Sequence, residues 1–209
     1  MSADGAALRD LALRLLPQGY GCAVQPLSAA ATPLLPEESA AVARAVPKRQ
    51  REFAVGRMVL RAAIREAGHA LPADRPIAAR PDRLPDLPRQ IRASLSHGGD
   101  HCIAIAAPPG GASVGIDLEP ISRALPEGLA EMVAPFRLTA VPDDPLLVFS
   151  IKEALFKAQY PLTGRMLDFS DVPVAIRDHR FRACLGNRLI GGLWGRAMGY
   201  YLSVSLCYG

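Results

Sequence analysis

Helical and strand-like stretches follow one another twice along this chain, and that order limits the fold more than any other feature. A proline that precedes apolar residues at helical spacing, as at Pro47 and at Asp144-Pro145, indicates the start of a helix. The predicted helices are 6–16, 37–46, 47 to about 68 and 145–161, and the predicted strands are two within 94–107, 114–118, 171–176, 181–185 and 200–207. Helices followed by clustered strands, twice over, predict an α+β fold with two similar-sized halves, residues 1–112 and 113–209.

The composition favours a globular protein of the cytoplasm. Half of the 209 residues are hydrophobic and 21% are charged, which suits a packed core and excludes disorder. Charged residues and prolines interrupt every apolar stretch, so we expect neither a signal peptide nor a membrane span. The cysteines show no CxxC spacing and lie in apolar surroundings, at Cys22, Cys102, Cys184 and Cys207. We therefore expect reduced core thiols, with neither a disulfide framework nor zinc.

The net charge of +4 is concentrated in the first half of the chain. Residues 44–65 contain seven basic side chains against one acidic side chain, Glu52. Arg57, Arg61 and Arg65 are four residues apart and so share one face of the predicted helix. That face is either simply solvated or binds phosphate or an acidic partner protein. Nucleic acid is a weaker interpretation, because aromatic residues do not alternate with the basic ones.

Two carboxylates share one face of the predicted strand 114–118. Side chains alternate along a strand, so Ile116 and its apolar neighbours point to the core while Asp117 and Glu119 project together on the other face. Carboxylates this close repel each other, and a bound cation relieves the repulsion. Oxygen ligands of this kind suit Mg²⁺, which completes its shell with waters and phosphate oxygens. The alternative is an exposed acidic strand end.

A third carboxylate occurs in the predicted helix 145–161. Glu153 and Lys157 have the favourable i, i+4 spacing of an ordinary surface ion pair. Apolar residues on both sides, such as Phe149 and Phe156, predict that the pair is partly buried, where a purely solvated pair gains little. The functional interpretation adds Glu153 to the same metal and gives Lys157 a phosphate to bind.

Ser96 and His97 precede the Gly98-Gly99 turn between two predicted strands. Neighbouring side chains on a strand point to opposite faces, so a Ser–His nucleophilic pair is geometrically poor here. His97 and His101 have the spacing of a zinc motif, but the glycines break the helix that such a motif needs. Hydroxyl and imidazole groups beside a tight turn would suit a phosphate ester.

Taken in order, these motifs resemble the 4′-phosphopantetheinyl transferases of the surfactin and enterobactin type. The resemblance rests on Ser96-His97, then 115–119 (Gly-Ile-Asp-Leu-Glu), then 149–157 with its Lys-Glu-Ala core, and continues through 160–169. Phe53-x-x-Gly56-Arg57-x-x-x-Arg61 is also similar to that family. The similarity covers residues 50–170 directly.

The resemblance implies a pseudo-twofold fold whose two halves bind coenzyme A between them. By the same resemblance, Asp117, Glu119 and Glu153 hold Mg²⁺, and Ser96, His97 and Lys157 contact coenzyme A. Arginines near the nucleotide complete the expected contacts, namely Arg57 with Arg61 and Arg80 as weaker matches. The implied reaction transfers phosphopantetheine to a serine of an apo acyl or peptidyl carrier protein and releases adenosine 3′,5′-bisphosphate. A monomer acting in siderophore or other secondary-metabolite biosynthesis is the corresponding expectation.

The residue types fit this chemistry without the family. Attack of a hydroxyl on a pyrophosphate phosphorus needs alignment and charge neutralisation more than covalent help. Lys157 and His97 would stabilise the developing charge, and Glu153 is the candidate base. The predicted catalytic residues are Glu153, Asp117 and Lys157. Two alternatives stay open at this point. One is another Mg²⁺-dependent phosphotransferase or pyrophosphatase that needs no carrier protein. The other is a non-catalytic module that binds nucleic acid through residues 44–65.

Overall fold

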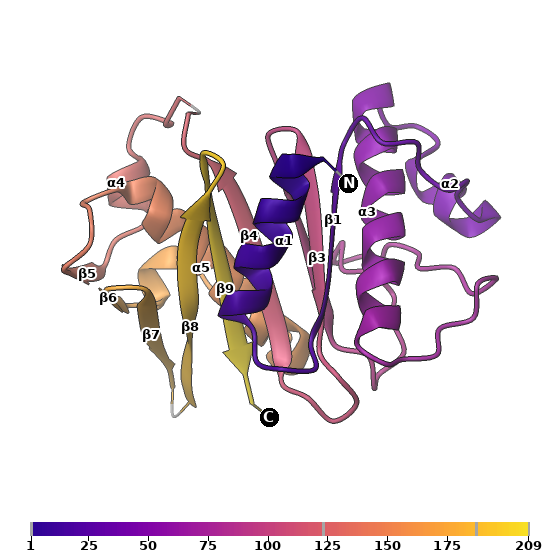
Figure 1. Ribbon diagram of the computed structural model, residues 1–209. Coiled ribbons are helices and arrows are strands. Elements are labelled where there is room, and N and C mark those ends of the chain that lie inside the picture. The colour runs from indigo at the N-terminus through magenta and orange to yellow at the C-terminus, as the bar shows by residue number, and fades with distance from the viewer. Residues whose placement is uncertain (1, 123, 187, 209) are drawn as a thin grey trace.

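The computed structural model describes residues 2–122, 124–186 and 188–208 (Figure 1). Its helices are α1 (Ala3–Leu15), α2 (Pro36–Val42), α3 (Pro47–Glu66), α4 (Leu129–Met132), α5 (Pro145–Thr163) and the short 3-10 helix η1 (Phe169–Asp171). Its strands are β1 (Gly21–Pro26), β2 (Ala93–Gly98), β3 (His101–Ala106), β4 (Ser113–Pro120), β5 (Phe136–Thr139), β6 (Val174–Arg177), β7 (Arg180–Leu185), β8 (Arg188–Ala197) and β9 (Tyr200–Cys207). The predicted α+β class is confirmed.

The strands form two sheets, one in each half of the chain. The smaller sheet has the order β1-β3-β2 and is antiparallel throughout. The larger sheet has the order β4-β9-β8-β7-β6-β5, in which only the β5–β6 pair of described strands is parallel. The break between the sheets falls between β3 and β4, next to the predicted division at 112/113. That division into two domains stays a prediction.

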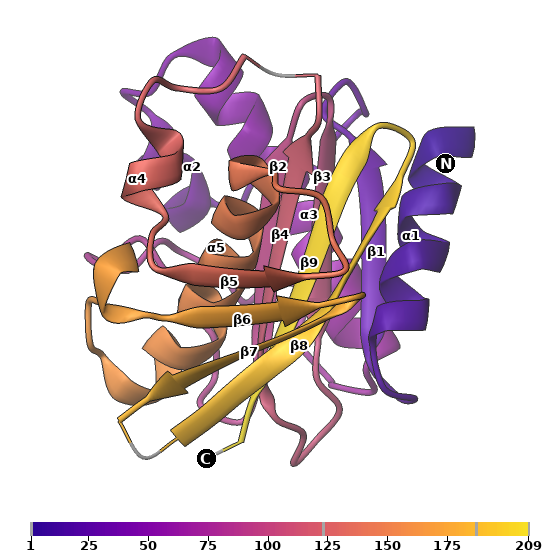
Figure 2. The same ribbon diagram turned by 90° about the vertical axis from the view of Figure 1, so that its left-hand side faces the viewer.

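Three hydrophobic clusters hold the helices on the sheets. One cluster packs α3 against the smaller sheet, and a second packs α5 and α4 against the larger sheet. The third joins α1 to both sheets, because Leu8 and Leu11 of the helix pack with Ile103 of β3 and Ile116 of β4. Figure 1 shows α1 in front of the junction of the two sheets, and Figure 2 shows it on the opposite side of β4 and β9 from α5.

A glycine lets the long helix approach its sheet closely in each half. A Cβ on Gly115 of β4 would lie 2.0 Å from the carbonyl oxygen of Ala154 in α5. A Cβ on Gly21 of β1 would lie 2.1 Å from the carbonyl oxygen of Ala63 in α3. Any side chain at either position would push the helix away from the strand. The recurrence of this contact supports the predicted pseudo-twofold arrangement, which itself stays a prediction.

The local signals at the start of α5 act as predicted. Asp144 caps the helix, since its Oδ1 accepts a hydrogen bond from the Leu146 amide at 2.9 Å, and Pro145 occupies the first turn. The predicted hairpin around Gly98-Gly99 is formed by β2 and β3. No strand was expected at β1, β5 or β8, and α4 was not expected either.

Three of the four cysteines are buried thiols as expected, but Cys184 is exposed on β7. Its side chain alternates to the solvent face, because the burial along β7 follows a strict period of two. Within the described ranges, no helix combines the length and the apolar character needed to cross a membrane.

Candidate functional site

The two sheets meet where serine hydroxyls of β2 reach the backbone of β4. Ser94 Oγ accepts a hydrogen bond from the Ile116 amide at 3.2 Å, and Ser96 Oγ accepts one from the Leu118 amide at 3.3 Å. The strands also come close at Gly98, where a Cβ would lie 2.2 Å from the Leu118 carbonyl oxygen. The hydroxyls satisfy amides at a junction where β2 and β4, as described, belong to different sheets and do not pair through their backbones. They thereby fix β4, and with it Asp117, against the first half.

Asp117 is the centre of a buried polar cluster at this junction. Its side chain is only 4% exposed, so it is not an exposed acidic strand end. Asp117 Oδ1 accepts hydrogen bonds from Lys157 Nζ at 2.7 Å and from Ser96 Oγ at 3.0 Å. Lys157 Nζ also donates to Ser96 Oγ at 3.3 Å and to the Ile116 carbonyl oxygen at 3.2 Å. Asp117 Oδ2 is buried and has no partner in the described structure.

Glu153 lies one helical turn before Lys157, and the charges of Lys157 and Asp117 both act on its carboxylate. Burial raises the pKa of Glu153, and the negative charge of Asp117 raises it further, while Lys157 opposes the shift. Glu119 follows Asp117 by two residues on the same face of β4 and is half-buried. Among the described residues no group of three or more His, Cys, Asp or Glu side chains gathers closely enough to be a metal site as it stands.

The donor chemistry nevertheless fits a divalent cation. A buried carboxylate oxygen without a partner, as in Asp117, is costly unless a ligand satisfies it. The half-buried carboxylate of Glu153, whose pKa is raised by the charge of Asp117, would be stabilised by the same cation. Both are hard oxygen ligands of the kind that Mg²⁺ prefers.

The side chain of His97 projects from the face of β2 opposite to Ser96 and reaches α3. Its Nε2 lies 3.3 Å from a guanidinium nitrogen of Arg49 and 3.9 Å from Glu52 Oε2. Partial burial lowers the pKa of His97, and the positive charges of Arg49 and Lys157 act in the same direction. Glu52 opposes this shift, but the net lowering of the pKa of His97 favours its neutral form. Arg49 is exposed beside it and belongs to the basic segment, although no spacing rule distinguished it from its neighbours.

Arg57, which the family resemblance predicts to lie near the nucleotide, is engaged in contacts within the protein. Arg57 is 6% exposed, and its Nε donates to the Ile77 carbonyl oxygen at 2.5 Å. The guanidinium carbon lies 3.9 Å from the centre of the Phe53 ring. Burial lowers the pKa of Arg57 to about 10, so the group is still charged at neutral pH. Arg57 thus holds the 69–92 loop against α3.

The other arginines of the predicted face also differ from one another. Arg61 is half-buried and pairs with the buried carboxylate of Glu38 at 2.6 Å. It donates to the Arg75 carbonyl oxygen at 2.8 Å as well, so it too fixes the 69–92 loop. Arg65 is exposed. Arg80 lies in the loop, half exposed, and pairs with Asp82 at 2.9 Å. Two members of the expected basic stripe are thus structural, which weakens the nucleic-acid interpretation.

Replacing Glu38 with glutamine is expected to lower the free energy of unfolding by about 2–3 kcal/mol at pH 7. Glu38 accepts from the Ile77 amide, the Leu35 amide and Arg61 at 2.7, 3.0 and 2.6 Å. Burial alone would raise the pKa of Glu38, but these donors hold it below its ordinary value. Urea denaturation measures the loss, with the exposed neighbour Glu37→Gln as a control that should change it by less than about 0.5 kcal/mol.

Comparing wild type with Glu38→Gln at several pH values gives the pH dependence of this loss of stability. A lowered pKa in the folded state means that the unfolded chain binds the proton first as the pH falls. The stabilising effect of Glu38 is therefore complete above the ordinary glutamate pKa of about 4.3 and disappears as the pH falls through the lower native value. A difference between wild type and Glu38→Gln that stays constant into acid would contradict the assignment.

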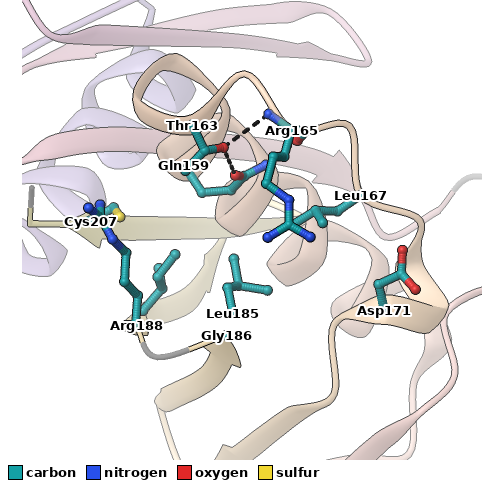
Figure 3. Close-up of a pocket in the computed structure, with 10 residues that line it drawn as sticks. Gln159, Thr163, Arg165, Leu167, Asp171, Leu185, Gly186, Arg188 and Cys207 are labelled. Atoms are coloured by element: carbon teal, nitrogen blue, oxygen red, sulfur yellow. Dashed lines mark hydrogen bonds between the residues drawn. The ribbon is translucent and has the colours of Figure 1, made fainter.

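A cavity of about 240 Å³ opens at the carboxyl end of α5, separate from the Asp117 cluster (Figure 3). Its wall includes Thr163, whose Oγ1 donates to Gln159 Oε1 at 2.5 Å, and Gln159 Nε2 in turn donates to the Arg165 carbonyl oxygen at 2.9 Å. These bonds close the end of the helix. None of the predicted site residues lines this cavity.

Two family models match successive parts of the chain. Residues 37–107 match the 4′-phosphopantetheinyl transferase N-terminal domain, and residues 113–191 match the 4′-phosphopantetheinyl transferase superfamily. The boundary between the matched parts coincides with the break between the two sheets.

Three curated proteins show the same relationship. The 4′-phosphopantetheinyl transferase Svp of Streptomyces mobaraensis is 41% identical over 68% of this chain and 61% of its own length. Npt of Nocardia iowensis is 34% identical over 73% of this chain and 70% of its own length. PptT of Mycobacterium tuberculosis is 34% identical over 67% of this chain and 64% of its own length. The chain thus spans slightly less than two thirds of two of these relatives. On these matches, the chain belongs to the 4′-phosphopantetheinyl transferase superfamily.

Proposed function

We propose that this protein transfers the 4′-phosphopantetheine group of coenzyme A to a serine hydroxyl of an apo carrier protein. Family membership gives the reaction class, and one observation carries it to this chain. Asp117, at the junction of the two sheets, keeps one buried carboxylate oxygen without a partner beside the ammonium of Lys157. A buried anion that is only half satisfied fits a site that waits for a cation and a phosphate.

We propose that Asp117, Glu119 and Glu153 hold Mg²⁺ in this site. When bound, the ion would neutralise charge on the pyrophosphate of coenzyme A. His97 and Lys157 would bind the phosphates, together with the hydroxyl of Ser96. Arg49 joins this set because it is exposed beside His97. Arg80 stays a candidate, whereas Arg57 and Arg61 would act indirectly by fixing the loop that carries Arg80.

In the proposed reaction, Glu153 takes the proton of the carrier serine as the serine oxygen attacks the β-phosphorus. The new bond joins that oxygen to phosphorus, and the bond from the same phosphorus to the bridging oxygen breaks. The electron pair leaves with adenosine 3′,5′-bisphosphate. The raised pKa of Glu153 suits a base that must accept a proton in the transition state. Lys157 would stabilise the negative charge that develops on the leaving phosphate.

The N-terminal end of α3 carries a basic surface that would bind an acidic carrier protein. Lys48, Arg49 and Arg51 are all exposed there, next to the side of β2 from which His97 projects. A carrier protein of opposite charge would be attracted to this surface and guided toward the junction.

Mass spectrometry of an apo carrier protein tests the proposal. After incubation with the enzyme, coenzyme A and Mg²⁺, we expect the carrier to gain the mass of one phosphopantetheine group. Its serine-to-alanine variant should gain none. Release of adenosine 3′,5′-bisphosphate in the absence of any carrier would instead identify a pyrophosphatase. An unmodified carrier across a panel of acyl and peptidyl carriers would refute the transfer.

A further inference from the structure

The ammonium group of Lys157 is bound as a metal ion would be. Three oxygens of different kinds surround it: the Asp117 carboxylate at 2.7 Å, the Ile116 carbonyl at 3.2 Å and the Ser96 hydroxyl at 3.3 Å. They come from two strands in separate sheets, whereas the lysine comes from α5. The side chain is 24% exposed, so the pair is largely shielded from solvent.

The equivalent place in the first half shows that packing does not require a lysine here. Lys157 follows Ala154, the residue whose carbonyl meets Gly115, by three positions in α5. Glu66 follows Ala63, whose carbonyl meets Gly21, by three positions in α3. Glu66 Oε2 accepts a hydrogen bond from the Cys22 amide at 3.2 Å, just as Lys157 donates to the backbone of Ile116. The helix–strand contact is thus compatible with the negative charge of Glu66 and with the positive charge of Lys157. The positive charge in the second half is therefore explained by its ion pair with Asp117.

The Asp117 carboxylate cannot bind a divalent cation and the Lys157 ammonium together without a cost in free energy, because the two positive charges repel each other. Lys157 and Ser96 occupy Oδ1 and leave Oδ2 alone, so an incoming cation would meet an ammonium group on the other oxygen of the same carboxylate. Two positive charges within about 4–5 Å repel each other by several kcal/mol at an effective dielectric constant of about 20.

We propose that Lys157 is a resident cation that stabilises Asp117 in the ligand-free enzyme and weakens divalent-cation binding until coenzyme A arrives. The phosphates of coenzyme A would draw the ammonium away from Asp117 and so free the carboxylate for the metal. Metal and coenzyme A would then bind with positive coupling that depends on this one side chain. The inference rests on the proposed function, because the metal and the coenzyme come from it.

Binding of Mn²⁺ alone, measured by electron paramagnetic resonance without coenzyme A, tests the inference. Lys157→Met and Lys157→Gln should bind Mn²⁺ about tenfold or more tightly than wild type, since the competing charge is gone. Gln keeps hydrogen-bond donors near Ser96 and Ile116, so it serves alone if the Met variant does not fold. The control Arg182→Met removes an equal charge from an exposed position on β7 and should leave the affinity unchanged.

Adding coenzyme A completes the test. Coenzyme A should tighten Mn²⁺ binding more in wild type than in either Lys157 variant. An affinity for Mn²⁺ alone that is equal to or weaker than that of wild type in both variants would overturn the inference, and so would the absence of Mn²⁺ binding to all of the proteins. Carrier loading by wild type reports separately on the proposed function, so transfer can be established while the resident-cation role fails.

Discussion

Glu153→Gln is expected to lower the rate of carrier loading on the order of 10²-fold or more, with a much smaller change in coenzyme A binding. The substitution keeps the shape of the side chain but removes the charge that would accept the serine proton and bind the metal. Burial and Asp117 raise the pKa of Glu153, so its charge is already costly in the ligand-free protein. The folded protein should therefore be no less stable without it. Loading rates at saturating coenzyme A and Mg²⁺ measure the effect.

Glu37→Gln provides the matched control, because Glu37 is exposed on α2 and takes no part in the site. That variant should load the carrier at the wild-type rate. If Glu153→Gln also loads at nearly that rate, Glu153 is only the i, i+4 partner of Lys157, with an effect on stability below about 1 kcal/mol. The three-carboxylate centre would then lose one of its members.

Gly115→Ala is expected to destabilise the protein by about 3 kcal/mol or more. The new Cβ would lie 2.0 Å from the Ala154 carbonyl oxygen and 2.6 Å from the Ala158 amide nitrogen. Both are backbone atoms, so α5 itself must move away from β4. The midpoint of urea unfolding measures the loss. Any protein that stays folded should also lose carrier loading, since the movement separates Lys157 from Asp117.

Gly56→Ala tests whether the effect comes from close contact rather than from the loss of glycine. Gly56 is buried in α3, but a Cβ there would meet only Leu95 Cδ1, at an ordinary 3.5 Å. Alanine in a helix interior should raise stability by about 0.5–1 kcal/mol. Equal and small effects of the two substitutions would mean that β4 and α5 adjust easily, contrary to the tight contact.

Much of the fold could be predicted because short-range sequence patterns determine it. Asp144 and Pro145 predict the start of α5 because a cap and an N-terminal proline act within one turn. The period of two at residues 114–119 predicts which side of β4 is apolar. The strand β1, by contrast, carries no alternation and ends in Pro26, so only its pairing with β3 identifies it as a strand.

Partners distant in the sequence explain what the prediction missed. Arg57 is spaced like a surface residue, but its partner, the Ile77 carbonyl, lies twenty positions away in a loop without periodicity. Lys152 stands in a motif read for Glu153 and Lys157, yet it is 1% exposed and donates to the Phe169 carbonyl oxygen at 2.6 Å. Ser94 gave no signal at all, because its role depends on the meeting of two separate sheets.

The position of α1 makes the site depend on the cooperativity of the whole chain. Leu8 and Leu11 complete an apolar cluster to which β3 and β4 both contribute, so this interior belongs to neither half alone. Opening either half at this cluster would expose apolar surface of the other half, so we expect the two halves to unfold together. Strand β4, which carries Asp117, contributes to this shared cluster, and β2 is held to β4 by the hydrogen bonds of Ser94 and Ser96. We expect the Asp117 cluster, which lies between the two sheets, to gain rigidity from this shared core.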